Sequence, residues 1–177
     1  MTRSRLRAAS GSFGFVLLGG PTIVAGLVPW LITRWNADHA PLPLRILGAA
    51  FLAAGALLVI ETTARFAVQG RGTPAPWAPP ERFVARGSYR VTRNPMYVGV
   101  IALIVGQAIL LGREILFAWA AAAWLIFHLF VLLHEEPDLR RRFGVEYEDY
   151  CRRVPRWATT SLVRPRHLRD RPVRRSR

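Results

Sequence analysis

The stretch VGVIALIVGQAILL-GRE-ILFAWAAAAWLIFHLFVLL, residues 98–133, decides which class of protein this sequence can form. It consists of two apolar runs, 98–111 and 115–133, joined by the three residues GRE. A helix needs roughly 20 mostly apolar residues to cross the hydrocarbon core of a bilayer. The second run has about that length, and the first is shorter. Because the connection is so short, we expect the two runs to form an antiparallel helical hairpin in a membrane.

Two more apolar runs lie ahead of this hairpin. Residues 13–33 carry no charge, and the run is longer than the apolar part of a typical signal peptide. Residues 44–66 carry Arg45 at one end and Glu61 and Arg65 near the other. We therefore expect an all-α integral membrane protein with four transmembrane helices, of which the last two form the short hairpin.

The composition points to the same class of protein. The chain has 177 residues, and its 25 basic residues, all of them arginine, outnumber 11 acidic residues to give a net charge of +14. Hydrophobic residues make up 51% of the chain, which is too apolar for a disordered basic protein. With one cysteine, Cys151, the chain cannot be a domain held together by internal disulfides.

The arginines are distributed unevenly, and their distribution predicts an orientation. They gather before residue 13, between residues 66 and 97 and after residue 133, whereas the other two loops hold only Arg34, Arg45 and Arg113. Arginine and lysine are enriched in cytoplasmic loops. We therefore expect a multi-pass protein of the inner (plasma) membrane, with both termini and the active site on the cytoplasmic side.

The chain divides into four regions by composition. Residues 1–68 form an N-terminal two-span region, and residues 69–80 are a Gly/Pro-rich cytoplasmic connector. Residues 81–157 contain the hairpin and the polar segments on either side of it. Residues 158–177 are a basic tail that we expect to be disordered and to meet anionic lipid headgroups of the bilayer. Nucleic acid is not an expected partner, and the oligomeric state is left open.

Local signals predict where helices begin. Asparagine is a good N-cap residue and proline suits the first helical position, so the third span should begin at Pro95, directly after Asn94. A further helix is predicted after Pro137, because apolar residues recur there at helical spacing: Leu139, Phe143, Tyr147 and Tyr150. This pattern indicates a cytoplasmic amphipathic helix that lies on the surface or folds back over the preceding loop.

Three isolated polar residues have simple interpretations. Glu61 is expected to form an ion pair with Arg65, four residues later on the same helix. His128 is expected to form a hydrogen bond inside the bundle rather than to bind a ligand. Cys151 and the scattered histidines show no metal-ligand spacing, so no metal site is predicted.

Short motifs surround the hairpin in a specific order. They are Gly87-x-Tyr89, Arg93-Asn94-Pro95-Met96-Tyr97, Glu135-Glu136, Phe143-Gly144-x-x-Tyr147-x-x-Tyr150 and Val154-Pro155. In this order the set resembles the isoprenylcysteine carboxyl methyltransferase and phospholipid methyltransferase superfamily. The resemblance covers residues 80–157, and the two N-terminal spans carry no recognisable motif.

The resemblance implies an integral membrane enzyme that transfers a methyl group from S-adenosylmethionine to a lipophilic or membrane-embedded small acceptor. Residues 81–157 would form the methyltransferase core, with the helix after the hairpin covering the cofactor pocket. By position, the residues that would bind the cofactor are Glu81, Arg82, Phe83, Val84, Tyr89, Asn94, Pro95, Met96, Tyr97 and Glu135. Of these, Glu135 and Tyr97 would be the catalytic residues.

Two departures from the family pattern bear on the acceptor. Asn94 stands where the family has histidine; it offers hydrogen bonds but cannot act as a general base near neutral pH. Val131 stands where the prenylcysteine enzymes have an arginine that orients a carboxylate acceptor. A carboxylate, an amine and a thiol therefore all stay open as acceptors.

Two other functions also stay open on the sequence. A nicotinamide-dependent membrane reductase of the sterol-reductase type would share a similar C-terminal core. A non-enzymatic membrane scaffold would act through its lipid-binding basic tail.

Overall fold

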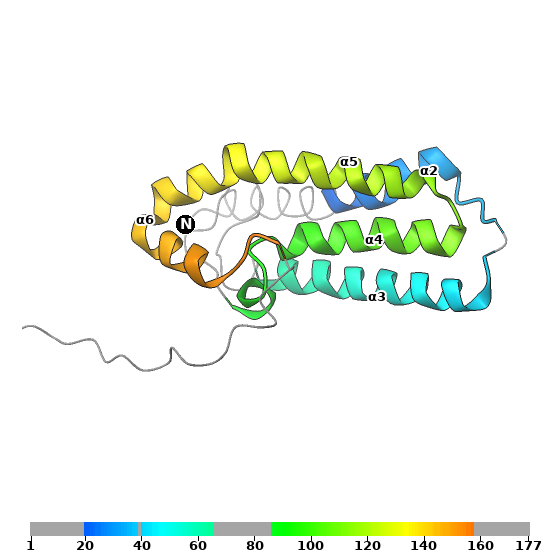
Figure 1. Ribbon diagram of the computed structural model, residues 1–177, viewed down its shortest axis with the longest axis horizontal. Helices are drawn as coiled ribbons and strands as arrows, with labels where there is room; N and C mark the ends of the chain where they lie inside the picture. Colours follow the sequence, from blue (N-terminus) through cyan, green and yellow to red (C-terminus); the bar gives the residue numbers. More distant parts are fainter. Residues whose placement is uncertain (1–19, 39, 66–85, 158–177) are drawn as a thin grey trace, which may run out of the picture.

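The described part of the chain is built from helices packed side by side (Figure 1). The computed structural model describes residues 20–38, 40–65 and 86–157, and no strand occurs within these ranges. The elements are a π-helical turn Ile23–Leu27, α2 (Val28–Thr33), α3 (Leu42–Arg65), a 3₁₀ turn Gly87–Arg90, α4 (Pro95–Leu111), α5 (Ile115–Phe130), a second π-helical turn Val131–Glu135 and α6 (Glu136–Arg153). The predicted all-α fold is confirmed for these residues.

Helices occur at all four predicted spans, but they differ in length. Two are long and apolar enough to cross a membrane: Leu42–Arg65 and the continuous run Ile115–Arg153. The apolar helices Gly20–Thr33 and Pro95–Leu111 are shorter, and residues 13–19 of the first predicted span lie outside the described residues. The connector 69–80 and the tail 158–177 lie outside them as well.

The outward faces of these helices are apolar. On α3, Leu42, Ile46, Leu57 and Ile60 each expose more than 60% of their surface. Soluble monomeric proteins rarely expose contiguous apolar patches of this kind. Lipid chains would cover such side chains, so the surface of α3 fits a location in a membrane.

α3 and α4 pack with their backbones in contact. A Cβ atom added at Gly55 would lie 2.8 Å from the carbonyl oxygen of Gly99, and one added at Gly106 would lie 2.9 Å from that of Gly48. Small residues allow this close approach between membrane helices. The sequence does not tell whether Gly99 and Gly106 pack helices within one chain or between chains. In the structure they pack against α3 of the same chain.

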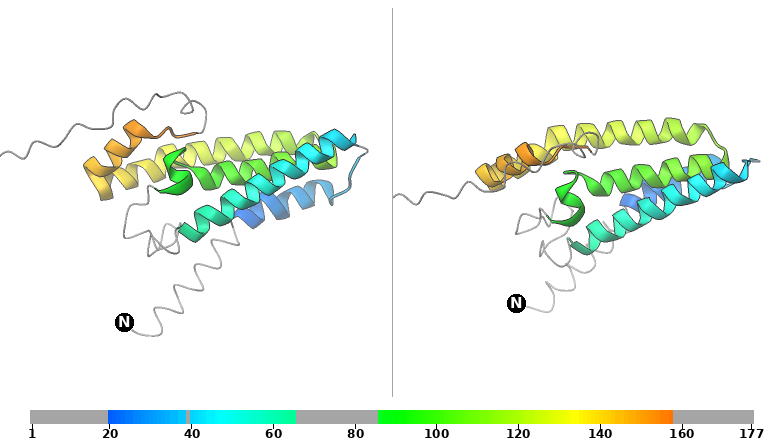
Figure 2. Two further views of the ribbon diagram at one scale, coloured as in Figure 1. Left: turned by 90° about the horizontal axis from the view of Figure 1, so that it is seen from below. Right: turned by 60° about the horizontal axis from the view of Figure 1, so that its bottom comes forward.

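α4 meets α5 through side chains instead. The core between them consists of Val100, Ile104, Ala108, Leu116, Ala120 and Ala123. The hairpin turns at Gly112, whose φ of 65° lies in the left-handed region that favours glycine at a helix end. Figures 1 and 2 show α4 lying beside both α3 and α5, which makes it the central helix of the described bundle.

The first π-helical turn is explained by a proline. The N–H of Val28 donates to the carbonyl oxygen of Ile23, five residues back, instead of to Val24. Pro29 follows directly and has no N–H to donate to Ala25. The carbonyl groups of Val24 and Ala25 therefore lack their usual α-helical donors.

Two polar side chains of neighbouring helices bond these carbonyl groups. Trp119 Nε1 of α5 donates to the oxygen of Val24 at 2.9 Å, and Gln107 Nε2 of α4 donates to that of Ala25 at 2.6 Å. Buried backbone carbonyl groups are nearly always hydrogen-bonded. These contacts therefore account for two polar groups inside otherwise apolar helices.

α6 is interrupted at Gly144. The sequence predicts one helix after Pro137, but Gly144 has φ 49° and ψ −123°, which breaks the helical backbone. The chain beyond it turns back toward the start of α4 (Figure 1). The residues predicted to share the apolar side gather in one cluster, in which Tyr147, Tyr150 and Val154 pack with Leu139, Phe143 and Cys151.

Candidate functional site

The polar residues of the candidate site come together where α3 and α5 end and α4 begins. Here Glu61, in the last turns of α3, accepts hydrogen bonds from Arg65 Nε and, at 2.5 Å, from Ser88 Oγ. The predicted ion pair between Glu61 and Arg65 is confirmed. Through Ser88, Glu61 also fixes the 3₁₀ turn Gly87–Arg90 to the end of α3, and this turn leads into the start of α4.

α4 begins at Pro95, as the sequence predicts. Two residues later, the Tyr97 hydroxyl group donates a hydrogen bond of 3.2 Å to Oε2 of Glu135, the last residue of the second π-helical turn. The Tyr97 ring stacks on Phe127 of α5, with 4.6 Å between ring centroids. The structure therefore brings together the two residues predicted to be catalytic, while their roles stay predictions.

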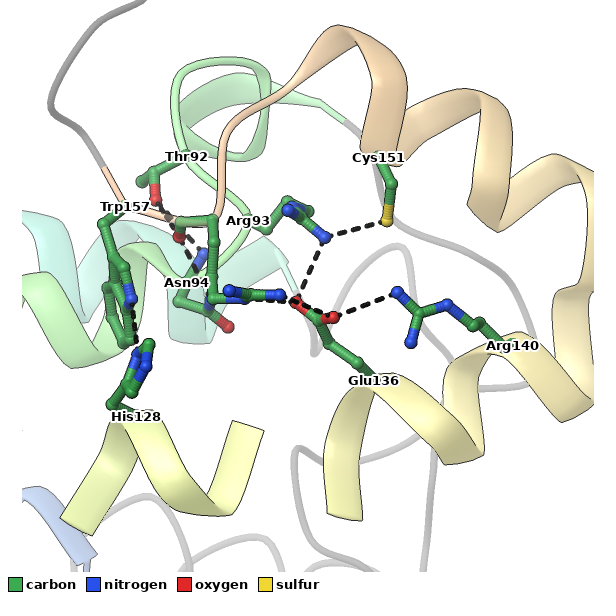
Figure 3. Close-up of polar contacts among 9 residues, drawn as sticks. Thr92, Arg93, Asn94, His128, Glu136, Arg140, Cys151 and Trp157 are labelled. Carbon is green, nitrogen blue, oxygen red and sulfur yellow. Dashed lines mark hydrogen bonds and ion pairs between the residues drawn. The ribbon is translucent and has the colours of Figure 1, made fainter. Parts of the chain in front are cut away.

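Glu136, the next residue, is buried among arginines. Its side chain is 3% exposed. Oε1 accepts from Arg93 Nη1 at 3.1 Å and from Arg156 Nε at 2.6 Å, and Oε2 accepts from Arg156 Nη2 at 3.1 Å and from Arg140 Nη2 at 3.2 Å. Arg93 Nη1 also lies 2.9 Å from Cys151 Sγ. We call Arg93, Glu136, Arg140 and Arg156 the arginine–glutamate cluster; Figure 3 shows Arg93 and Arg140 pointing toward Glu136.

The arginine–glutamate cluster joins three segments of the chain. Arg93 precedes α4, Glu136 and Arg140 lie in the first turns of α6, and Arg156 follows α6. A buried carboxylate is tolerated when it is paired and hydrogen-bonded. The hydrogen bond to Glu136 raises the pKa of the Arg156 guanidinium, so this pair remains fully charged at physiological pH.

Residues 154–157, here called the C-terminal strap, run across the start of α4. The N–H of Arg93 donates to Pro155 O at 2.9 Å, and Thr92 Oγ1 donates to Arg156 O at 2.9 Å. At its far end, Trp157 Nε1 donates to His128 Nδ1 of α5 at 3.0 Å. His128 thus forms a hydrogen bond, as predicted, but its partner lies in the strap and not in a helix of the bundle. The strap connects α4 with α5 (Figure 3).

Asn94 lies directly before α4, and its role in cofactor binding stays a prediction. It occupies the N-cap position of α4, but its side chain forms no capping hydrogen bond. Its amide Nδ2 instead donates to Arg156 O at 3.1 Å, while its own N–H donates to Thr92 Oγ1 at 3.3 Å. The prediction of a capping side chain is wrong, because the strap places a carbonyl oxygen within reach of the amide.

The remaining predicted cofactor residues lie on both sides of this point. Tyr89 is buried, its carbonyl oxygen accepts a hydrogen bond of 2.7 Å from the Tyr150 hydroxyl group, and burial raises the pKa of its phenol well above the ordinary value. Pro95 is buried and Met96 half-buried in the first turn of α4. Residues 81–84, predicted as Glu81, Arg82, Phe83 and Val84, lie outside the described residues.

Sequence reasoning assigned no role to most of the arginine–glutamate cluster or to the strap. Glu136 and Arg140 are four residues apart on one helix, a spacing that suits an ion pair, and this ion pair is present at 3.2 Å. Sequence reasoning assigned nothing to Arg93 or Arg156, although a signal existed: a glutamate next to an apolar span requires counter-charges. Among the residues that the structure describes, no group of three or more His, Cys, Asp and Glu side chains is placed to hold a metal ion.

A family model matches a large part of this sequence. The family model described as phospholipid methyltransferase matches residues 44–146, which is more than half of the chain. The match begins in α3 and ends in α6, so it includes the central helix α4, the hairpin and both glutamates.

Two curated proteins resemble parts of the chain. Methanethiol S-methyltransferase 2 of Bradyrhizobium diazoefficiens is 36% identical over 67 residues, which are 38% of this chain and 25% of that protein. Protein-S-isoprenylcysteine O-methyltransferase B of Arabidopsis thaliana is 33% identical over 75 residues, which are 42% of this chain and 38% of that protein. The matches thus span well under half the length of these relatives, and no solved structure matches the chain significantly. Because the family model covers most of the helical core and the site, the chain belongs to the phospholipid methyltransferase family.

Proposed function

We propose that this protein is an integral membrane methyltransferase that transfers a methyl group from S-adenosylmethionine to a lipophilic or membrane-embedded small acceptor. Membership of the family supports methyl transfer. The names of the two relatives refer to methylation at sulfur in one case and at oxygen in the other. The acceptor atom of this chain therefore stays open among a carboxylate, an amine and a thiol.

The contact between Tyr97 and Glu135 carries the proposal. Among residues 20–38, 40–65 and 86–157, no arginine or histidine forms an ion pair with Glu135, whereas its neighbour Glu136 has three such partners. A carboxylate with only a neutral hydroxyl partner suits a cationic ligand. The stacked rings of Tyr97 and Phe127 offer aromatic faces that also attract a cation.

S-Adenosylmethionine has groups that fit these residues. It carries an ammonium and a sulfonium, for which Glu135 and the aromatic rings are suitable partners, and a carboxylate, for which the start of α4 is suitable. When bound, it supplies a methyl group that is already activated for in-line displacement. The chain then has to hold and align the reacting groups and to exclude water from them.

Glu135 and Glu136 would have different roles. Glu136 is unsuited to be a general base, because it is buried and hydrogen-bonded to three arginines. If the acceptor is an amine that must lose a proton, the base is Glu135 or the exposed His134. A carboxylate or thiolate acceptor would need no base.

The finer features of the membrane arrangement are part of the same proposal. We place the site at the cytoplasmic face, with four spans and with α6 covering the cofactor. The location of Arg93, Arg140 and Arg156 at this end of the bundle supports the orientation.

Calorimetric binding of S-adenosylmethionine and S-adenosylhomocysteine to the detergent-purified protein tests the proposal. Replacing a carboxylate that pairs with a bound cation costs about 1.5–3 kcal/mol, so Glu135→Ala should weaken binding by roughly ten- to a hundredfold. Glu114→Ala is the matched control, because Glu114 is exposed at the opposite end of α5. Both Glu135→Ala and Tyr97→Phe should also slow the transfer of a labelled methyl group.

Two results would contradict the proposal. A folded wild type that binds neither compound, in lipid as well as in detergent, would exclude this cofactor. Equal binding by wild type and Glu135→Ala would exclude the assigned site.

A further inference from the structure

Two contacts join the same two segments of the chain. Arg93 and Tyr97 lie on either side of the first residue of α4, and Glu135 and Glu136 are consecutive at the junction of the second π-helical turn with α6. Arg93 contacts Glu136 at 3.1 Å, and Tyr97 contacts Glu135 at 3.2 Å. One ion pair and one hydrogen bond from a hydroxyl group therefore set the separation between these segments.

The ionic contact is the more constrained of the two. The side chains of Glu136 and Arg93 are 3% and 13% exposed, and Arg156 binds both carboxylate oxygens of Glu136 from the strap. Bidentate arginine–carboxylate pairs fix orientation as well as distance. The Tyr97–Glu135 contact is a single hydrogen bond, and its 3.2 Å is longer than the usual O–H···O distance of about 2.5–3.0 Å.

The backbone transmits the position of one glutamate to the other. The N–H of Glu136 donates to Val131 O, five residues back, and so closes the π-helical turn that ends at Glu135. Because Glu135 and Glu136 are consecutive in this hydrogen-bonded turn, a shift of the Glu136 backbone also moves Glu135. Single π-helical turns inside α-helices are frequent at functional sites.

We propose that Glu136 is a positioning residue that acts through Arg93 and Arg156 to place Glu135 against Tyr97. This inference rests on the proposed function, because it assigns to Glu136 the alignment of the residues that hold the methyl donor. Arg140 contributes less, since its side chain is half exposed and forms one contact with Glu136.

Arg156→Gln is the most informative substitution. It removes the guanidinium from Glu136 but keeps the carbonyl oxygen that accepts from Thr92 and Asn94. Arg142→Gln is the matched control, because Arg142 pairs with Asp138 at 2.8 Å on the exposed side of α6. Arg156→Lys keeps the charge but loses the bidentate geometry, and it serves if Arg156→Gln does not fold.

Calorimetry with S-adenosylhomocysteine separates positioning from folding. We expect Arg156→Gln to raise Kd about tenfold at unchanged stoichiometry, because shared contacts couple neighbouring sites, and Arg142→Gln to leave Kd unchanged. Arg156→Lys should change Kd in the same direction by a smaller factor. If Arg156 stabilises the fold only, the stoichiometry of binding falls while Kd stays the same.

The double variant Arg156→Gln/Tyr97→Phe tests whether Arg156 affects ligand binding through the Tyr97–Glu135 contact. If Arg156 acts through the Tyr97–Glu135 contact, the double variant should bind about as weakly as the weaker single variant, since coupled residues are not additive. If the two factors multiply, or if Kd is unchanged in Arg156→Gln, the inference is overturned while the proposed function stands. No binding by the wild type would overturn both.

Discussion

The two faces of α4 are built in different ways. Toward α3, Gly99 and Gly106 let the helix backbones touch, so that even an added Cβ atom would lie under 3.0 Å from its nearest neighbour. Toward α5, the contact near the start of α4 consists of side chains, with Tyr97 stacked on Phe127 and hydrogen-bonded to Glu135. One face leaves no room for chemistry, and the other carries the predicted catalytic residues.

This difference shows how a small membrane protein can hold a precise site. The side of α4 toward α3, here called the glycine face, fixes α4 against α3, and Glu61 of α3 fixes the turn before α4. The side toward α5, here called the site face, then needs only to place the end of α5 correctly, which the arginine–glutamate cluster can do. The close glycine packing and the predicted catalytic residues lie on different faces of α4, so substitutions can test the two faces separately.

The largest loss of stability is expected on the site face, for Glu136→Ala. The substitution leaves Arg93 and Arg156 without their buried counter-charge, and breaking a buried ion pair on one side costs about 3–5 kcal/mol. Thermal unfolding in detergent, followed by circular dichroism, should show a decrease in Tm of many degrees.

Glu135→Ala is the adjacent control for this experiment. It removes one hydrogen bond to Tyr97, which is worth about 0.5–1.5 kcal/mol, so its Tm should change little although ligand binding is weakened. Equal Tm values for the two variants would show that Glu136 is not the anchor of this face.

The sequence predicts the glycine face poorly and the site face better. Apolar runs and Pro95 are local signals, and they indicate the hairpin, the start of α4 and a helix after Pro137. The pairing of Gly48 and Gly55 with α4 depends on which helices become neighbours. Periodicity within one helix carries no information about that choice.

The site is predictable where residues lie in one motif and not where distant segments meet. Tyr97 and Glu135 were assigned from their motifs, and the structure places them in contact. Arg156 lies 20 residues beyond Glu136 in the sequence and reaches it only because α6 breaks at Gly144. The helical spacing of apolar residues continues through Gly144 and gives no sign of this break. The arginine–glutamate cluster therefore depends on a glycine whose effect on the backbone the pattern does not reveal.

A smaller effect is expected on the glycine face, for Gly106→Ala. The new Cβ atom would lie 2.8 Å from Leu52 N and 2.9 Å from Gly48 O, and neither backbone atom can move alone. Overpacking of this kind costs about 1–3 kcal/mol, and the decrease in Tm should be correspondingly moderate. Gly26→Ala is the control, because among the described residues its Cβ would meet Thr22 Cγ2 alone, at 3.7 Å; a similar decrease there would refute the explanation by close packing.

The smallest decrease in Tm is expected for Gln107→Leu, which tests the contact between α4 and the first π-helical turn. Gln107 bonds the Ala25 carbonyl group that Pro29 leaves without a donor. Hydrogen bonds between membrane helices contribute about 0.6–2 kcal/mol, so the loss of Tm should be small but measurable. Pro29→Ala supplies a backbone N–H for the same carbonyl group. In that background Gln107→Leu should therefore cost less, and an undiminished cost would show that Gln107 stabilises the bundle by packing rather than by its hydrogen bond.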